Sequence, residues 1–164
     1  MMRRAETTAV LVHCSDSPGG SARDIEDWHR GRGFETIGYH YVIENGRSPG
    51  GRLLDPARDG LIVAGRDEAL VGAHEELANL TAVGVCLVGR DWFTANQRAS
   101  LYGLLATILY RYRMGFESVL GHYELDEGRT CPNLDLERVR AKLALVVGQF
   151  NAVLRSQHEI GAPV

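Results

Sequence analysis

The chain has 164 residues, of which 45% are hydrophobic and 24% charged, as is ordinary for a globular domain. This composition excludes a disordered, collagen-like or coiled-coil protein, and a chain of this length can bury a core without disulfide bonds. The formal net charge of −3 argues against a nucleic-acid partner, because nucleic-acid-binding domains usually carry a basic surface. We expect one domain that does not bind nucleic acid, and we expect it to be a monomer.

The chain begins with a polar arm at residues 1–8, which contains Arg3 and Arg4. The apolar run that follows is too short for a secretory signal, and no stretch approaches the roughly 20 apolar residues that a membrane span needs. We therefore expect synthesis in the cytoplasm without a signal peptide. The three cysteines, Cys14, Cys86 and Cys131, are too few for a disulfide framework and odd in number.

A strand and a helix are predicted directly after the arm. The apolar run at 9–13 is bounded by polar residues, which predicts a short buried strand. Ser21 and Asp24 then have the spacing of a capping box, which predicts the start of a helix. This helix is expected to end near Gly31 or Gly33, because glycine is common just after a helix.

The next segment predicts two strands with a long connection. Aromatic and β-branched residues at 39–44 predict the first of them. The Asn45-Gly46 pair that follows is typical of a two-residue hairpin turn. Residues 47–60 are rich in glycine and proline and are expected to form an extended loop or lid, after which 61–64 returns as a strand.

The second half of the chain predicts two more strands and two more helices. The run 83–88 is apolar throughout except for its glycine and predicts a buried strand. Thr94 and Gln97 repeat the capping-box spacing, and apolar residues at helical spacing follow them. A short strand is predicted at 119–120, and Asp135 is expected to open a last helix.

Strands and helices therefore alternate along the chain, which predicts a single α/β domain, with a central mixed β-sheet flanked by α-helices. No internal repeat or low-complexity tract interrupts this order. We expect the domain to span residues 9–156, followed by a tail at 157–164.

Two histidines and a cysteine form a candidate metal site. His13 and His122 each close a predicted strand, and strand ends beside loops are where α/β folds place their sites. Cys131 lies in the loop after His122, and a thiolate with two imidazoles suits Zn²⁺ with a fourth position open to water. Alternatively, the histidines are ordinary strand-end residues and Cys131 is a small buried side chain. The wide separation along the chain leaves both interpretations open.

Short segments along the chain occur in the order found in a known family of enzymes. They are 12–15, 38–43, 64–68, 71–74, 83–89, 121–122 and 130–132. Together they resemble the zinc-dependent type-2 N-acetylmuramoyl-L-alanine amidases, which include phage lysis enzymes and animal peptidoglycan recognition proteins. The resemblance covers roughly residues 9–145. It is stronger to the phage amidase-type lysozymes, because Cys131 stands where peptidoglycan-recycling relatives usually have aspartate.

The resemblance implies a role for five residues. His13, His122 and Cys131 match the zinc ligands of the family, and Tyr39 matches its active-site tyrosine. Arg129 stands where the phage enzymes have a catalytic lysine. Arginine stays protonated and so cannot donate a proton, but it can stabilise a developing oxyanion by charge and hydrogen bonds. These five residues are the expected catalytic and metal-binding set.

Four further residues have weaker assignments. His40 and His74 are candidates for substrate binding, although a histidine in a turn is an equal interpretation of His74, and strand alternation points Tyr39 and His40 in opposite directions. The same alternation predicts that Cys14 points away from the metal into the core. Cys86 is expected to be a packing residue. It stands where recycling amidases carry a glutamate, which leaves the general base unassigned.

The activity implied by the resemblance is hydrolysis of the amide between N-acetylmuramic acid and L-alanine in peptidoglycan. Such an enzyme reaches the cell wall after release from the cytoplasm, by the holin-type route of a phage or prophage endolysin. One alternative is a catalytically silent muropeptide-binding module, which would lack the thiolate ligand that Cys131 supplies. Another is a cytosolic muropeptide-recycling amidase, against which Cys131 and the missing glutamate argue.

Overall fold

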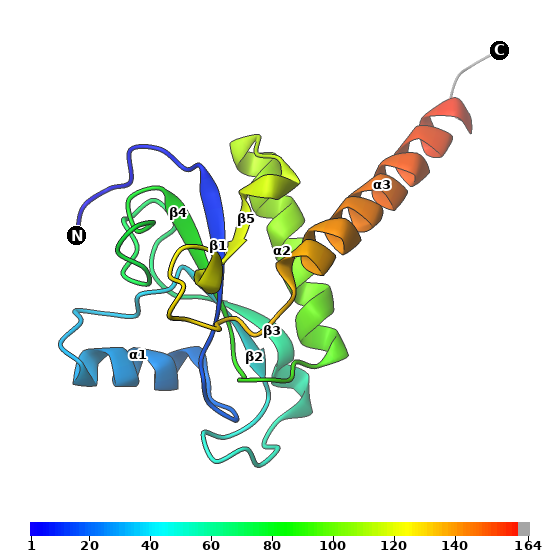
Figure 1. The fold of residues 1–164 in the computed structure, drawn as a ribbon. Helices are drawn as coiled ribbons and strands as arrows, with labels where there is room; N and C mark the ends of the chain where they lie inside the picture. Colours follow the sequence, from blue (N-terminus) through cyan, green and yellow to red (C-terminus); the bar gives the residue numbers. More distant parts are fainter. Residues whose placement is uncertain (161–164) are drawn as a thin grey trace.

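Five strands form one mixed sheet in the order β3-β2-β4-β1-β5 (Figure 1). The computed structural model describes the backbone of residues 1–160 and the side chains of residues 1–149. The strands are β1 (Ala9–Cys14), β2 (Tyr41–Asn45), β3 (Asp59–Ala64), β4 (Ala82–Leu87) and β5 (Val119–Gly121). The α-helices are α1 (Ala22–Gly31), α2 (Ala95–Tyr112) and α3 (Leu136–Ile160), and short 3₁₀ helices lie at Pro56–Arg58, Phe116–Ser118 and His122–Glu124. The predicted α/β architecture is confirmed.

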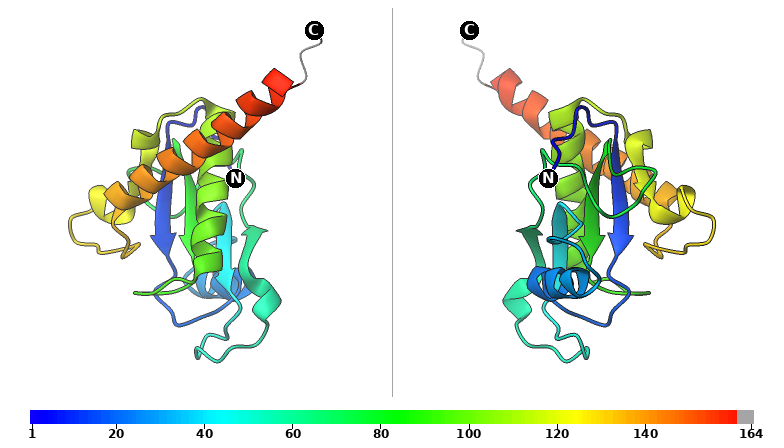
Figure 2. Two further views of the ribbon diagram at one scale, coloured as in Figure 1. Left: turned by 90° about the vertical axis from the view of Figure 1, so that its right-hand side faces the viewer. Right: turned by 90° about the vertical axis from the view of Figure 1, so that its left-hand side faces the viewer.

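The first strand lies inside the sheet and faces two different layers. β1 pairs in parallel with β4 on one side and with β5 on the other. Val10, Val12 and Cys14 pack into the core under α2 and α3, whereas Leu11 and His13 point to the other face. Helix α1 covers that other face (Figure 2). Alternation along one short strand therefore places His13 opposite the larger core, and the prediction that Cys14 packs in the core is confirmed.

Both capping boxes predicted from the sequence are present. The Ser21 side chain accepts a hydrogen bond from the Asp24 backbone at the start of α1, and the Asp24 carboxylate accepts one from the Ser21 backbone. Thr94 and Gln97 make the same exchange at the start of α2. These bonds satisfy backbone N–H groups that the first turn of a helix leaves without a partner. Local side chains thus determine where α1 and α2 begin.

A long loop joins β2 to β3, as the glycine- and proline-rich segment predicts, and the Asn45-Gly46 pair does not close a two-residue hairpin. β2 and β3 are antiparallel, but the pairing that ends at Asn45 involves Asp59, so a long loop separates the strands. Gly46 has a φ of +67°, and its carbonyl oxygen accepts hydrogen bonds from the backbones of Leu54 and Asp55. The Asn-Gly pair therefore begins an extended loop instead of closing a hairpin.

The two ends of the chain differ in how they join the domain. The arm at 1–8 runs beside residues 69–71, where the Arg4 backbone donates to Ala69 and Arg3 forms an isolated bridge with Leu70. Helix α3 extends away from the sheet toward the C-terminus (Figure 1). Within the predicted tail 157–164, residues 157–160 continue α3, and residues 161–164 lie outside the described residues.

Among the described helices, none is long and apolar enough to span a membrane.

Candidate metal centre and its cleft

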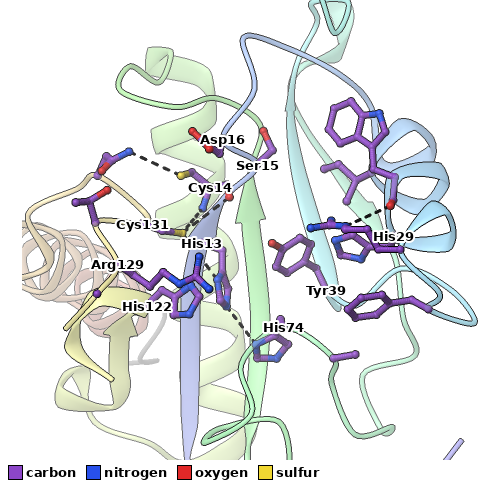
Figure 3. A pocket seen from close by; sticks show the side chains of 18 residues that line it. His13, Cys14, Ser15, Asp16, His29, Tyr39, His74, His122, Arg129 and Cys131 are labelled. Atoms are coloured by element: carbon purple, nitrogen blue, oxygen red, sulfur yellow. Dashed lines mark hydrogen bonds between the residues drawn. The ribbon is translucent and has the colours of Figure 1, made fainter. Parts of the chain in front are cut away.

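A cleft of about 580 Å³ opens on the α1 side of the sheet, beside the end of β1 (Figure 3). Its walls come from β1, from helix α1 and the segment after it, and from the loop before α3. Of the seven candidate catalytic, metal-binding and substrate-binding residues, six line it: His13, Tyr39, His74, His122, Arg129 and Cys131. The fold therefore gathers, in one cleft, residues that are distant along the chain.

Three of these residues converge closely enough to hold one metal ion. One potential ligand atom from each of His13, His122 and Cys131 lies within 4.8 Å of the others. Sγ of Cys131 is 3.9 Å from Nδ1 of His13. The backbone N–H of Cys14 donates to the same sulfur at 3.1 Å. This donor favours the thiolate, the form that binds a metal, although the contact with the Cys14 side chain and burial raise the pKa of Cys131 overall. The donor set of two imidazoles and one thiol fits Zn²⁺.

His13 has its second ring nitrogen engaged outside this set. Nε2 of His13 lies 3.2 Å from Nδ1 of His74. Burial lowers the pKa of His13 well below its usual range, and it lowers the pKa of His74 to about 3. Both rings are therefore neutral near pH 7, so each carries one N–H and one lone pair. Nε2 of His13 contacts His74, and Nδ1 of His13 faces Cys131. Nδ1 is therefore the ring nitrogen that could bind a metal held with Cys131.

The ring of His74 occupies space that two glycines leave open. A Cβ atom added at Gly84 would lie 2.4 Å from Cδ2 of His74, and one at Gly72 would lie 2.5 Å from the same atom. Gly84 belongs to β4, whose other residues carry buried side chains. The absence of a side chain at 72 and 84 thus allows His74 to stand beside His13.

We expect Gly84→Ala to destabilise the fold by about 1–3 kcal/mol, as is typical when a group is forced into a packed site. Urea unfolding measures this change. Gly103→Ala is the matched control, because a Cβ at Gly103 in α2 meets nothing within 4 Å. Alanine at 103 should raise the free energy of unfolding by about 0.4–1 kcal/mol. Equal stability of Gly84→Ala and the parent would contradict this account of His74 packing.

Tyr39 places its ring against the candidate metal ligands. The centroid of its ring is 5.1 Å from that of His13 and 6.3 Å from that of His74. Burial raises the pKa of Tyr39 well above its usual value. The hydroxyl therefore keeps its proton near neutral pH and is a hydrogen-bond donor facing the cleft.

Arg129 reaches the cleft from the loop before α3. Its guanidinium Nε lies 3.2 Å from Oδ2 of Asp126, and its side chain is 61% exposed. Exposed pairs of this kind contribute little to stability. The guanidinium is therefore free to exchange Asp126 for another anion without a large loss of stability.

His40 is the one candidate that does not line the cleft. It is buried, and its Nδ1 accepts a hydrogen bond from the Gly84 backbone at 2.8 Å. Its Nε2 lies 3.0 Å from the carbonyl oxygen of Leu70 and 3.3 Å from the guanidinium of Arg4. Burial lowers its pKa to about 4, so the ring is neutral. These contacts join the start of β2 to β4 and to the N-terminal arm.

Sequence reasoning missed several residues of the site. Helix α1 and the segment after it contribute Trp28, His29 and Phe34 to the cleft, and Nδ1 of His29 accepts a hydrogen bond from the Gly38 backbone at 2.8 Å. Glu75 contacts His122 through Nε2 of its ring at 2.5 Å. Helical spacing identified α1, but it could not show which of its residues face a cleft.

Comparison with known proteins identifies the family. Residues 3–134 match the family N-acetylmuramoyl-L-alanine amidase. The endolysin of Enterobacteria phage T3 is 38% identical over 154 residues, which cover 87% of this chain and 91% of that protein. The structure of N-acetylmuramoyl-L-alanine amidase LysC from Clostridium intestinale URNW is similar, with a TM-score of 0.70, 25% identity and 87% of each chain covered.

A recognition protein from an animal has the same fold. Wild-type Drosophila PGRP-LB gives a TM-score of 0.66 with 23% identity, over 88% of this chain and 83% of that one. The expected kinship with phage lysis enzymes is thus confirmed, and PGRP-LB shares the fold. The chain belongs to the N-acetylmuramoyl-L-alanine amidase family and is an enzyme of that class, similar to phage endolysins over nearly its whole length.

Proposed function

We propose that the chain is a zinc-dependent amidase that hydrolyses the bond between N-acetylmuramic acid and the L-alanine of the peptide stem. The observation that carries the proposal is the convergence of His13, His122 and Cys131 within 4.8 Å, in a cleft that Tyr39 and Arg129 also line. A zinc ion held by these three residues would polarise the scissile carbonyl and lower the pKa of a water molecule toward about 7.

Tyr39 and Arg129 supply the groups that stabilise negative charge on the carbonyl oxygen. The Tyr39 hydroxyl is protonated and donates a hydrogen bond, and Arg129 adds a positive charge that does not depend on pH near neutrality. Donors placed in advance where charge develops lower the barrier, since they need no reorganisation during the reaction. Neither residue needs to transfer a proton for this role.

The other candidate histidines support the site indirectly. His74 lies beside His13, and the 3.2 Å contact between their ring nitrogens supports a role in orienting that ligand. The burial of His40 between Gly84 and Leu70 supports a structural role instead of substrate binding. Two aromatic residues that line the cleft, Trp28 of α1 and Phe34 of the segment after it, offer apolar surface to the substrate.

The similarity to phage endolysins also supports a route to the substrate. We place the enzyme in the cytoplasm after synthesis and at the cell wall after a holin-type pore or membrane failure releases it. Peptidoglycan is then the macromolecular partner of the enzyme. The enzyme acts on it as a monomer.

The bond that is cleaved tests the proposal directly. Digestion of purified peptidoglycan should release free stem peptides and leave long glycan strands without new reducing ends. Mass spectrometry of the soluble products and a reducing-sugar assay measure the two quantities. A glycosidase would give the reverse result through a pair of carboxylates across its cleft. Reducing ends that rise in proportion to lysis would refute the amidase assignment.

A further inference from the structure

Glu75 contacts a candidate metal ligand from outside the main cleft. Oε2 of Glu75 is 2.5 Å from Nε2 of His122, and both side chains are 12% exposed. Glu75 lines a neighbouring cavity, to which His74, His122 and Arg129 also contribute. A carboxylate can only accept a hydrogen bond, so Nε2 of His122 must carry the proton. The free lone pair of the ring is therefore on Nδ1.

The segment that carries Glu75 is held by its own hydrogen bonds. Oδ1 of Asn79 accepts from the backbones of His74 and Glu75, at 2.8 and 3.0 Å. The second carboxylate oxygen of Glu75 accepts from the Leu77 backbone at 3.3 Å. The carboxylate is thus fixed by the turn that contains it, and does not depend on His122 for its position.

Two adjacent residues of this turn engage the two histidines of the candidate metal centre. His74 contacts Nε2 of His13, and Glu75 contacts Nε2 of His122. Both rings are thereby left with Nδ1 available. A hydrogen bond at one imidazole nitrogen selects the tautomer and the orientation in which the other nitrogen binds a metal.

We propose that Glu75 is a positioning residue for His122. Its carboxylate keeps the ring in the Nε2–H tautomer, directs Nδ1 toward the metal position and makes that nitrogen a stronger donor. The proposal rests on the proposed function, because it takes His122 as a zinc ligand. Asp126 is a second carboxylate near His122, since potential ligand atoms of Glu75, His122 and Asp126 lie within 4.8 Å of one another. Its oxygens, however, accept hydrogen bonds from the Arg129 guanidinium and the Gly128 backbone. Glu75 is therefore the carboxylate that holds the ring.

Zinc affinity of Glu75→Gln tests the proposal. We expect zinc to bind about 10–100-fold more weakly than to the parent, as is typical when a partner of a ligating histidine is changed. Competition with a chromophoric zinc chelator measures the dissociation constant. Glu76→Gln is the matched control, because it removes the same charge from the next residue, which is exposed and lines the same neighbouring cavity. It should bind zinc within about twofold of the parent.

The tautomer of His122 is a second readout, independent of catalysis. Nitrogen-15 NMR of the zinc-free parent should show the proton of His122 on Nε2. Glu75→Gln should retain this tautomer, since an amide oxygen still accepts, and Glu75→Ala should lose it. Circular dichroism verifies that each variant is folded.

Zinc binding by both Glu75 variants within twofold of the parent would overturn the proposal and leave the amidase assignment standing. A parent chain that cleaves the amide bond but binds no zinc would overturn the proposed metal and this inference together.

Discussion

Cys131→Ala is expected to abolish zinc binding and to lower turnover by about 10³-fold or more. The thiolate is one of three candidate ligand atoms within 4.8 Å of one another, and its loss leaves two imidazoles. Metal-assisted activation of water and carbonyl contributes several kcal/mol to transition-state stabilisation, and about 1.4 kcal/mol corresponds to a factor of ten in rate. Elemental analysis and a peptidoglycan digestion assay measure the two losses. His13→Ala should behave in the same way.

Cys86→Ala is the matched control for this substitution. Cys86 is a fully buried cysteine of β4 that packs with Val42 and Val88 and does not line the cleft. Its replacement should lower stability slightly while zinc content stays near one. Circular dichroism of Cys131→Ala must accompany the assay, because loss of a metal also weakens a fold that binds it. A Cys131→Ala protein with one tightly held zinc and full activity would eliminate the proposed ligand set.

Arg129→Ala is expected to lower kcat by about 10²–10³-fold while zinc content stays near one. This factor is typical of the removal of one donor that stabilises an oxyanion, and it corresponds to about 2.7–4 kcal/mol of barrier. The ion pair with Asp126 is exposed, so its loss should leave stability nearly unchanged. Steady-state kinetics on a soluble muropeptide separates the effect on kcat from any effect on KM.

Arg129→Lys should retain a larger share of the activity, because the positive charge stays in place. Arg138→Ala is the control for a general loss of positive charge, because Arg138 on α3 pairs with Asp135 just before that helix and its side chain is 89% exposed. It should turn over at the rate of the parent. An Arg129→Ala enzyme within about twofold of the parent would show that Arg129 is a solvated loop residue, and Tyr39 would then be the sole protein donor to the oxyanion.

The parts of the fold that sequence reasoning predicted correctly depend on short-range chemistry. The capping boxes at Ser21 and Thr94 involve side chains three residues apart, so the sequence displays the whole interaction. The burial of Cys14 follows from strand alternation in the same way. At Asn45-Gly46 the local preference for a positive φ is present, but it does not close a hairpin, because Asn45 pairs with Asp59 across a long loop.

The parts of the site that sequence reasoning missed depend on contacts between segments far apart along the chain. Glu75 precedes His122 by many residues, and no spacing rule connects a carboxylate in one turn with an imidazole in another. His40 is a substrate-binding candidate from the sequence, although strand alternation points it away from Tyr39. The structure shows that His40 is enclosed by Gly84, Leu70 and Arg4. Long-range placement of this kind requires the complete fold.

Because β1 is first in the chain and yet lies between β4 and β5, the enzyme cannot acquire its activity in stages during translation. Its parallel partners at 82–87 and 119–121 leave the ribosome long after β1 itself, and pairing with them closes long loops. Folds dominated by such distant pairings form slowly compared with those built from local contacts. Until Cys131 has emerged, the growing chain lacks a candidate ligand. If Cys131 is a metal ligand, a partly synthesised chain should therefore be inactive until nearly the entire domain has been made.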